Sequence, residues 1–393
     1  MVKAGKERLL SLDILRVMAA VAVVLMHTVS GVLNGNFDMT GYERRRRAFL
    51  AIMDATAWCV PIFLMISGYF LLNPALKMTW KDALVRYCRR IFLALLFFGV
   101  PYALLELVSR ERGFRVGMLW EAAGLTATGK TWAHMWYLYL ILILYAVTPA
   151  LRWVLKKLPH PAVCVLLGSI ALLASFLPFA SELLGWGVKI GNWQQTIYVF
   201  YYCMGYVFAT GLGGQDKTKE GKSKGEKRNF RGGVICLALF AVILLAEMGS
   251  RFLEGYELNM AYAYPPTLLA ALLLFGGSLM IGRERAKGDL ARNPKGRAKG
   301  DLARDPDRSP KARVPGESKS RMRRLLTGLV PLTFGIYLIH PVFLNFFYKF
   351  MGISIMDFRF IIGVPLFFGI SFLGSAFGTW VLRLIPPVKK YVL

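Results

Sequence analysis

The stretch LDILRVMAAVAVVLMHTVSG, residues 12–31, decides the fold class because it is long and apolar enough to cross a lipid bilayer as one helix. It nevertheless carries three ionisable side chains, Asp13, Arg16 and His27. At ~100° and ~1.5 Å per residue, Arg16 and His27 lie three turns apart on one helix face, or ~16 Å along it. Asp13 falls on the same face. We therefore predict a transmembrane helix that carries a polar stripe.

Similar apolar runs recur along the 393-residue chain, in which 56% of residues are hydrophobic. Short basic segments separate the runs, a pattern typical of a polytopic membrane protein. We predict an all-α bundle of about ten transmembrane helices. The predicted spans are residues 11–33, 50–72, 91–108, 133–151, 162–179, 194–212, 234–250, 263–282, 326–349 and 359–386.

The net charge of +26 would suggest a nucleic-acid partner in a soluble protein, but here the basic residues gather in alternate loops. With the N-terminus in the cytoplasm, the cytoplasmic segments hold 35 Lys and Arg residues and the opposite loops hold 10. The positive-inside rule therefore predicts two cytoplasmic termini. We expect a multi-pass protein of the cytoplasmic membrane whose partner is the lipid bilayer and not nucleic acid. The run Arg44–Arg47 departs from this pattern, because it would lie in an outer loop.

Two predicted cytoplasmic loops, residues 213–233 and 283–325, are basic and poor in large apolar residues. The second contains the octapeptide RAKGDLAR twice, at 285–292 and 297–304. Such segments bury too little apolar surface to fold, so we predict disordered linkers within one membrane domain over residues 1–393. The sequence has no phosphate-binding loop and no His/Cys cluster with metal-ligand spacing, so we predict no metal site.

The polar stripe is the first of several motifs. LDILR followed by His27 resembles the first-helix motif of the acyltransferase-3 family of membrane O-acyltransferases. Further matches follow in the family's order: PIFLMISGYFLL at 61–72 resembles its second helix, RYCR at 86–89 its RxxR motif, HMWYLYLILILYAVTP at 134–149 its HxWYL helix, and FGIYLIHP at 334–341 its penultimate helix. The family uses cytoplasmic acyl-CoA to acylate extracytoplasmic carbohydrates. The resemblance therefore implies acetyl-CoA or another acyl-CoA as donor, and an envelope glycan or lipid-linked sugar as acceptor.

Arg86, Arg89 and Arg90 lie where the third predicted span meets the cytosol, the compartment of the polyanionic donor. Composition alone would make them positive-inside anchors, whereas the motif match favours acyl-CoA binding. At positions i and i+3, Arg86 and Arg89 share a helix face, so we expect their guanidinium groups to bind phosphate oxygens. Arg16, near the same membrane surface, is expected to hold the donor or to pair with Asp13.

His27 lies three turns further out, near the level at which an extracytoplasmic hydroxyl arrives. A neutral imidazole is well suited to take a hydroxyl proton near neutral pH. We therefore predict a catalytic stripe of His27, Arg16 and Asp13, with His27 as general base or as acyl-carrying nucleophile. The stripe would mark the path along which an acyl group crosses the membrane.

Aromatic and histidine side chains on two other spans are candidates for acceptor binding. His134, Trp136 and Tyr137 open the fourth span, where they form either an interfacial aromatic belt or a platform for a sugar ring. Tyr337 and His340 are three residues apart on the ninth span, so they share a face that we expect to point into the bundle beside the site.

Two other functions stay open. Ten spans with buried ionisable residues would also serve a proton-coupled transporter or exporter of a small solute. The absence of a clear inverted hydropathy repeat disfavours that reading. A membrane sensor with a degenerate acyltransferase domain is the third reading, which the intact set of Arg16, His27, Arg86 and Arg89 disfavours.

Overall fold

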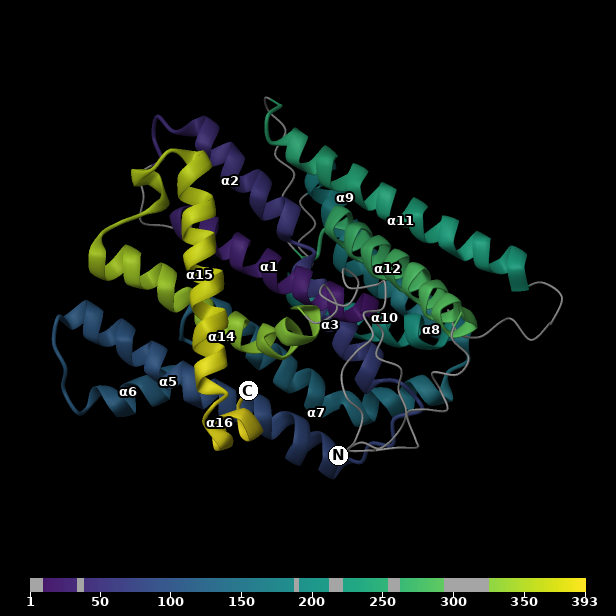
Figure 1. The fold of residues 1–393 in the computed structure, drawn as a ribbon, viewed down its shortest axis with the longest axis horizontal. Helices are drawn as coiled ribbons and strands as arrows, with labels where there is room; N and C mark the ends of the chain where they lie inside the picture. The colour runs from purple at the N-terminus through teal and green to yellow at the C-terminus, as the bar shows by residue number, and fades with distance from the viewer. Residues whose placement is uncertain (1–9, 34–38, 187–190, 212–221, 254–261, 293–324) are drawn as a thin grey trace, which may run out of the picture.

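The computed structural model describes residues 10–33, 39–186, 191–211, 222–253, 262–292 and 325–393, which form helices and turns without a strand (Figure 1). Within these ranges nine helical runs are long and apolar enough to cross a membrane. The runs are Leu10–Leu33, Glu43–Leu71, Trp80–Glu111, Ala133–Lys157, His160–Leu184, Asn229–Ser250, Pro265–Gly282, Leu325–Met351 and Phe360–Leu382. The predicted all-α polytopic fold is confirmed.

The helices that matter for the site come from all parts of the chain. Their bounds are α1 Leu10–Leu33, α2 Glu43–Thr56, α3 Cys59–Leu71, α5 Arg89–Glu111, α6 Met118–Ala127, α7 Trp136–Lys157, α8 His160–Ala171, α9 Leu177–Leu184, α10 Ile197–Gly211, α11 Lys222–Ser250, α12 Pro265–Arg292, α14 Thr333–Asn345, α15 Phe360–Leu382 and α16 Pro386–Tyr391. Helix α1 packs against α2, α3, α12, α14 and α15 (Figure 1). The polar stripe of α1 therefore lies inside the bundle.

One predicted span is shorter than expected. Residues 194–212 form α10, a helix of 15 residues that follows a short 3₁₀ turn at Gly191–Thr196. At ~1.5 Å per residue, α10 is ~22 Å long, less than the ~30 Å of a hydrocarbon core. Its aromatic side chains Tyr201 and Tyr202 are fully buried. Helix α10 is thus apolar because it packs inside the protein.

Three basic segments are more helical than predicted. Helix α11 begins at Lys222, inside the predicted loop 213–233, and α12 continues to Arg292, inside the predicted loop 283–325. The run Arg44–Arg47 lies in the first turns of α2 and not in a loop. Arg, Lys and Glu have good helix propensity, and extending an existing helix costs little, so the helices run on into polar sequence. The remaining parts of the two loops, including the second RAKGDLAR, lie outside the described residues.

Helices α3 and α10 cross at two glycines. A carbon added at Gly68 would meet the backbone carbonyl of Tyr202, and one added at Gly205 would meet backbone atoms of Met65 and Tyr69. Neither helix backbone can yield as a flexible side chain would. Small residues at both positions let the two helices approach closely, as is common between membrane helices.

Substituting Gly205 by Ala is expected to destabilise the protein, because the added methyl group must push the two backbones apart. Overpacking of this kind typically costs ~1–3 kcal/mol. The check is the thermal midpoint of the detergent-purified protein, compared with Gly124→Ala in α6, where an added carbon meets nothing within 4 Å. Equal midpoints for the two variants would contradict the close α3–α10 crossing.

Candidate active site

Three of the four histidines in the chain meet inside the bundle, although they come from three separate segments. His27 lies on α1, His134 on a 3₁₀ turn at the start of α7, and His340 on α14. The ring centroids of His27 and His340 are 5.1 Å apart, those of His134 and His340 5.7 Å, and those of His27 and His134 6.3 Å. His134 and His340 are buried, whereas His27 keeps partial exposure. We call these residues the histidine cluster.

Two ring nitrogens of the cluster are buried and make no hydrogen bond within the described residues. The Nδ1 atom of His340 lies 3.1 Å from the carbonyl oxygen of Ile336, and a carbonyl only accepts, so the neutral ring carries its proton on Nδ1. Its Nε2 atom is then a hydrogen-bond acceptor. Within the described ranges, neither this Nε2 nor that of His134 has a hydrogen-bond partner, although both are buried. Unpaired buried nitrogens are costly, which indicates a place for a ligand's polar group.

Two tyrosines fix the helices around the cluster. The Tyr337 hydroxyl donates to the backbone carbonyl of His134, and its ring lies 5.8 Å from that imidazole. The Tyr102 hydroxyl on α5 donates to the carbonyl of Leu338 at 2.7 Å, and its ring is also 5.8 Å from His134. These bonds tie α14 to α5 and to the start of α7. The positions of the three imidazoles are therefore set by contacts between helices.

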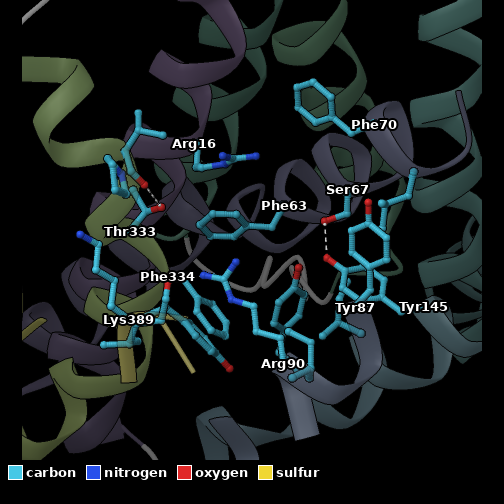
Figure 2. A pocket seen from close by; sticks show the side chains of 18 of the residues that line it. Arg16, Phe63, Ser67, Phe70, Tyr87, Arg90, Tyr145, Thr333, Phe334 and Lys389 are labelled. Carbon is cyan, nitrogen blue, oxygen red and sulfur yellow. Dashed lines mark hydrogen bonds between the residues drawn. The ribbon is translucent and has the colours of Figure 1, made fainter. Parts of the chain in front are cut away.

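A cavity of about 620 Å³ lies beside the cluster (Figure 2) and is lined by residues of α1, α3, α5, α7, α14 and α16 and by Arg383, which follows α15. Four cationic side chains line this basic cavity: Arg16, Arg90, Arg383 and Lys389. No Asp or Glu of the described residues lines it. Its remaining wall is largely aromatic, with Phe63, Phe70, Tyr87, Tyr137, Tyr145, Phe334 and Tyr337. The cavity is thus suited to a ligand with an anionic part and an apolar part.

Two cations of the basic cavity, Arg90 and Arg383, are oriented by hydrogen bonds to main-chain oxygens. Arg90 donates to the backbone oxygen of Leu393, and its guanidinium lies 5.7 Å from the centre of the Phe334 ring. Arg383 donates to the carbonyl of Pro331 at 2.9 Å. Figure 2 shows Arg16 and Arg90 reaching in from opposite walls, with Phe63 between them. Four cationic side chains and no Asp or Glu side chain of the described residues line the wall, which favours an anionic ligand there.

One aromatic side chain, Tyr337, lies between the basic cavity and the histidine cluster. Tyr337 lines the cavity, and its ring centroid lies 6.2 Å from that of His340. Tyr137, also in the cavity wall, is 5.6 Å from Tyr337. A ligand with its anionic end at Arg90 therefore extends toward the imidazoles along aromatic side chains.

The three arginines predicted to bind the donor, Arg86, Arg89 and Arg90, do not all line the basic cavity. Residues Ala83–Cys88 form a π-helical turn, whose wider winding changes the relative directions of the side chains around it. All three arginines are exposed, but of the three it is Arg90 that lines the basic cavity. Arg86 lies over the ring of Tyr87 at 5.7 Å, and Arg89 over that of Tyr391 at 5.2 Å. Tyr87 lines the cavity, and Tyr391 lies on α16 two residues after Lys389, which also lines it.

Of the other residues predicted for the site, some lie at the basic cavity and one lies away from it. Arg16 and Tyr137 line the basic cavity, and Asp13 is buried on α1 one turn before Arg16. Trp136 points elsewhere, with its ring 5.3 Å from Tyr198 and 5.8 Å from Tyr262.

Sequence reasoning missed three residues near the site. Arg383 is a charge inside the predicted span 359–386, and Lys389 belongs to the basic segment after it, so both read as anchors. Tyr102 lies in an apolar span, where its hydroxyl group is the one feature of the sequence that marks it as polar.

In the described part of the chain, no group of three His, Cys, Asp or Glu residues is arranged to hold a metal ion.

Comparison with known proteins gives one match. A family model described as an acyltransferase domain, Acyl_transf_3, matches residues 9–384, nearly the whole chain. No curated protein and no solved structure matches the chain. The matched range contains the whole histidine cluster and the cavity residues Arg16, Arg90 and Arg383.

Proposed function

The chain belongs to the acyltransferase-3 family, and from this we propose that it moves an acetyl or other short acyl group from cytoplasmic acyl-CoA to a hydroxyl of an envelope glycan or lipid-linked sugar. One observation carries the proposal: the basic, aromatic cavity ends beside three clustered imidazoles. We infer that the Arg90 end of the bundle faces the cytoplasm, where acyl-CoA is made, in agreement with the charge asymmetry of the loops.

The two parts of acyl-CoA fit the two parts of the basic cavity. Its phosphates are bound by Arg16, Arg90 and Arg383, since guanidinium groups form strong paired hydrogen bonds with phosphate oxygens. Its pantetheine arm packs on the aromatic wall, and the thioester reaches Tyr137 and Tyr337. Arg86 and Arg89 act at the mouth, where they add positive charge around the incoming donor.

The histidine cluster supplies the proton transfers of the reaction. An imidazole, for which we propose His27, accepts the proton of the acceptor hydroxyl while the hydroxyl oxygen attacks the thioester carbonyl carbon. The carbon–oxygen bond forms, the carbon–sulfur bond breaks, and the proton passes to the departing thiolate of CoA. If His27 first carries the acyl group, a carbon–nitrogen bond to its ring forms as the carbon–sulfur bond breaks and the thiolate of CoA leaves; in a second step the acceptor oxygen attacks, the carbon–nitrogen bond breaks, and the imidazole takes the hydroxyl proton. The unpartnered Nε2 atoms of His134 and His340 accept hydrogen bonds from groups near the reacting carbon.

The proposed function is tested with purified protein in lipid nanodiscs. The protein is mixed with radiolabelled acetyl-CoA and with acceptors, both methyl glycosides of neutral hexoses and oligosaccharides released from the cell envelope. We expect labelled ester, identified by mass spectrometry as one added acyl group per acceptor. Release of free acetate without any ester, or proton-dependent solute flux in vesicles without any ester, would reject the acyltransferase assignment.

A further inference from the structure

A second cavity, of about 310 Å³, lies toward the other end of α5. Its wall includes Glu106 on α5 and the consecutive residues Lys130, Thr131 and Trp132 before α7. Glu106 is 16 residues from Arg90, which corresponds to ~24 Å along the helix. Arg90 in the wall of the basic cavity and Glu106 in the wall of the second cavity thus lie toward opposite ends of α5. We call the second one the Glu106 cavity.

The carboxylate in this cavity is fixed by two donors. The indole Nε1–H of Trp132 donates to Oε2 of Glu106 at 3.2 Å, and the ammonium of Lys349 forms an ion pair with the same oxygen. Lys349 comes from the π-helical turn after α14, so the pair joins distant parts of the chain. A carboxylate has about four acceptor positions, and these two bonds leave others for a ligand's hydroxyl groups.

The Glu106 cavity borders the histidine cluster through two stacked rings. Trp132 and Tyr102 stack with their centroids 4.3 Å apart and their planes within 8°. The Trp132 ring is 6.4 Å from His134 and the Tyr102 ring 5.8 Å from it. The cluster therefore has a cavity on each side: the basic cavity reaches it through Tyr337, and the Glu106 cavity reaches it through Trp132 and Tyr102.

We propose that the Glu106 cavity binds the acyl acceptor, and that the acceptor presents a hydroxyl-bearing sugar ring there; this rests on the proposed function. Glu106, Thr131 and Lys130 provide hydrogen-bonding groups for ring hydroxyls, and Trp132 provides an apolar face for the ring's C–H groups. The volume is near the lower limit of small-molecule sites, which suits one ring rather than a long segment.

The test is two-substrate kinetics on three variants. Glu106→Gln removes the negative charge, and Trp132→Phe removes the indole donor that orients it. The matched control is Glu111→Gln, on the same helix, where the exposed Glu111 contacts Arg115 and lies outside the cavity wall. The probe is the neutral methyl hexoside that the wild type acylates best. We expect at least a tenfold higher KM for this acceptor in the first two variants, with the KM for acetyl-CoA within twofold of wild type in all three.

The outcomes separate this inference from the proposed function. If the wild type acylates no acceptor, both the acyltransferase assignment and the acceptor site are rejected. If the wild type is active and both variants keep its acceptor KM, the acceptor binds elsewhere. If Glu106→Gln lowers the thermal midpoint, Trp132→Phe, which leaves the Lys349–Glu106 pair in place, decides the result.

Discussion

His27→Ala is expected to lower the rate of acyl transfer at least a hundredfold, because a positioned general base typically contributes ~10² to 10⁴ in rate. His27 is the member of the histidine cluster whose residue keeps partial exposure, and its ring lies 5.1 Å from that of His340, so we assign the proton transfer to it. The KM for acyl-CoA should stay within a few-fold of wild type, since Arg16 in the basic cavity lies ~16 Å from His27 along α1. The measurement is the initial rate in nanodiscs at saturating donor.

Two further histidine variants make the result specific. His27→Gln, which keeps a hydrogen-bonding group but cannot take up a proton, should lose as much activity as His27→Ala. His160→Ala is the matched control, because His160 is exposed on α8, with its Nδ1 3.6 Å from the Cys164 sulfur, and lies outside the cluster. Full transfer by His27→Ala, or an equal loss in His160→Ala, would dismiss the catalytic role of His27.

Arg90→Ala should raise the KM for acetyl-CoA by ~10- to 150-fold. Hydrogen bonds to charged groups contribute ~1.5–3 kcal/mol, and 1.4 kcal/mol corresponds to about tenfold in affinity. Arg90→Lys should restore only part of the loss, because a point charge replaces the planar guanidinium. Lys81→Ala provides a control for the loss of one positive charge. Lys81 is exposed, lies nine positions before Arg90 in the chain, and is outside the cavity wall.

The donor itself provides the sharper control. Acetyl-pantetheine carries the thioester but none of the phosphates of acetyl-CoA. If Arg90 binds phosphate, Arg90→Ala and wild type should use acetyl-pantetheine equally, although they differ with acetyl-CoA. An equal loss with both donors would mean that Arg90 supports the shape of the cavity and does not bind phosphate.

The sequence predicted the membrane bundle well because transmembrane helices are specified by long apolar runs, which a single sequence displays directly. The short α10 was the exception: buried Tyr201 and Tyr202 make it as apolar as a span. Basic segments beyond the membrane were predicted as loops, but helix continues into them, since composition marks the lipid boundary and not the end of the hydrogen-bonded backbone.

Site residues were harder to place, because helices that are apolar all round give little sign of which face points inward. His27, His134 and His340 stood out as polar groups in apolar spans, yet their meeting point depends on how α1, α7 and α14 pack. Trp136 and its neighbour Tyr137 point in different directions, and only Tyr137 reaches the basic cavity.

An irregular backbone turn explains why the arginine that lines the cavity differs from the two singled out by their spacing in the sequence. The spacing of Arg86 and Arg89 assumed a regular α-helix, but the π-helical turn at Ala83–Cys88 shifts the winding, and Arg90 is the arginine of this group that lines the cavity. The pairing of Glu106 with Lys349 joins residues 243 positions apart. No local pattern in the sequence reports such a contact.

The most direct test of acyl transfer across the bundle uses sealed vesicles that contain the purified protein. The neutral methyl hexoside is trapped inside, and radiolabelled acetyl-CoA is added outside, so that donor and acceptor meet only through the protein. We predict labelled acetyl hexoside inside the vesicles for wild type and none for His27→Ala. Vesicles of wild type that bind acetyl-CoA but form no internal ester, when the same protein in nanodiscs acylates the hexoside, would contradict a site reached from both sides of the membrane.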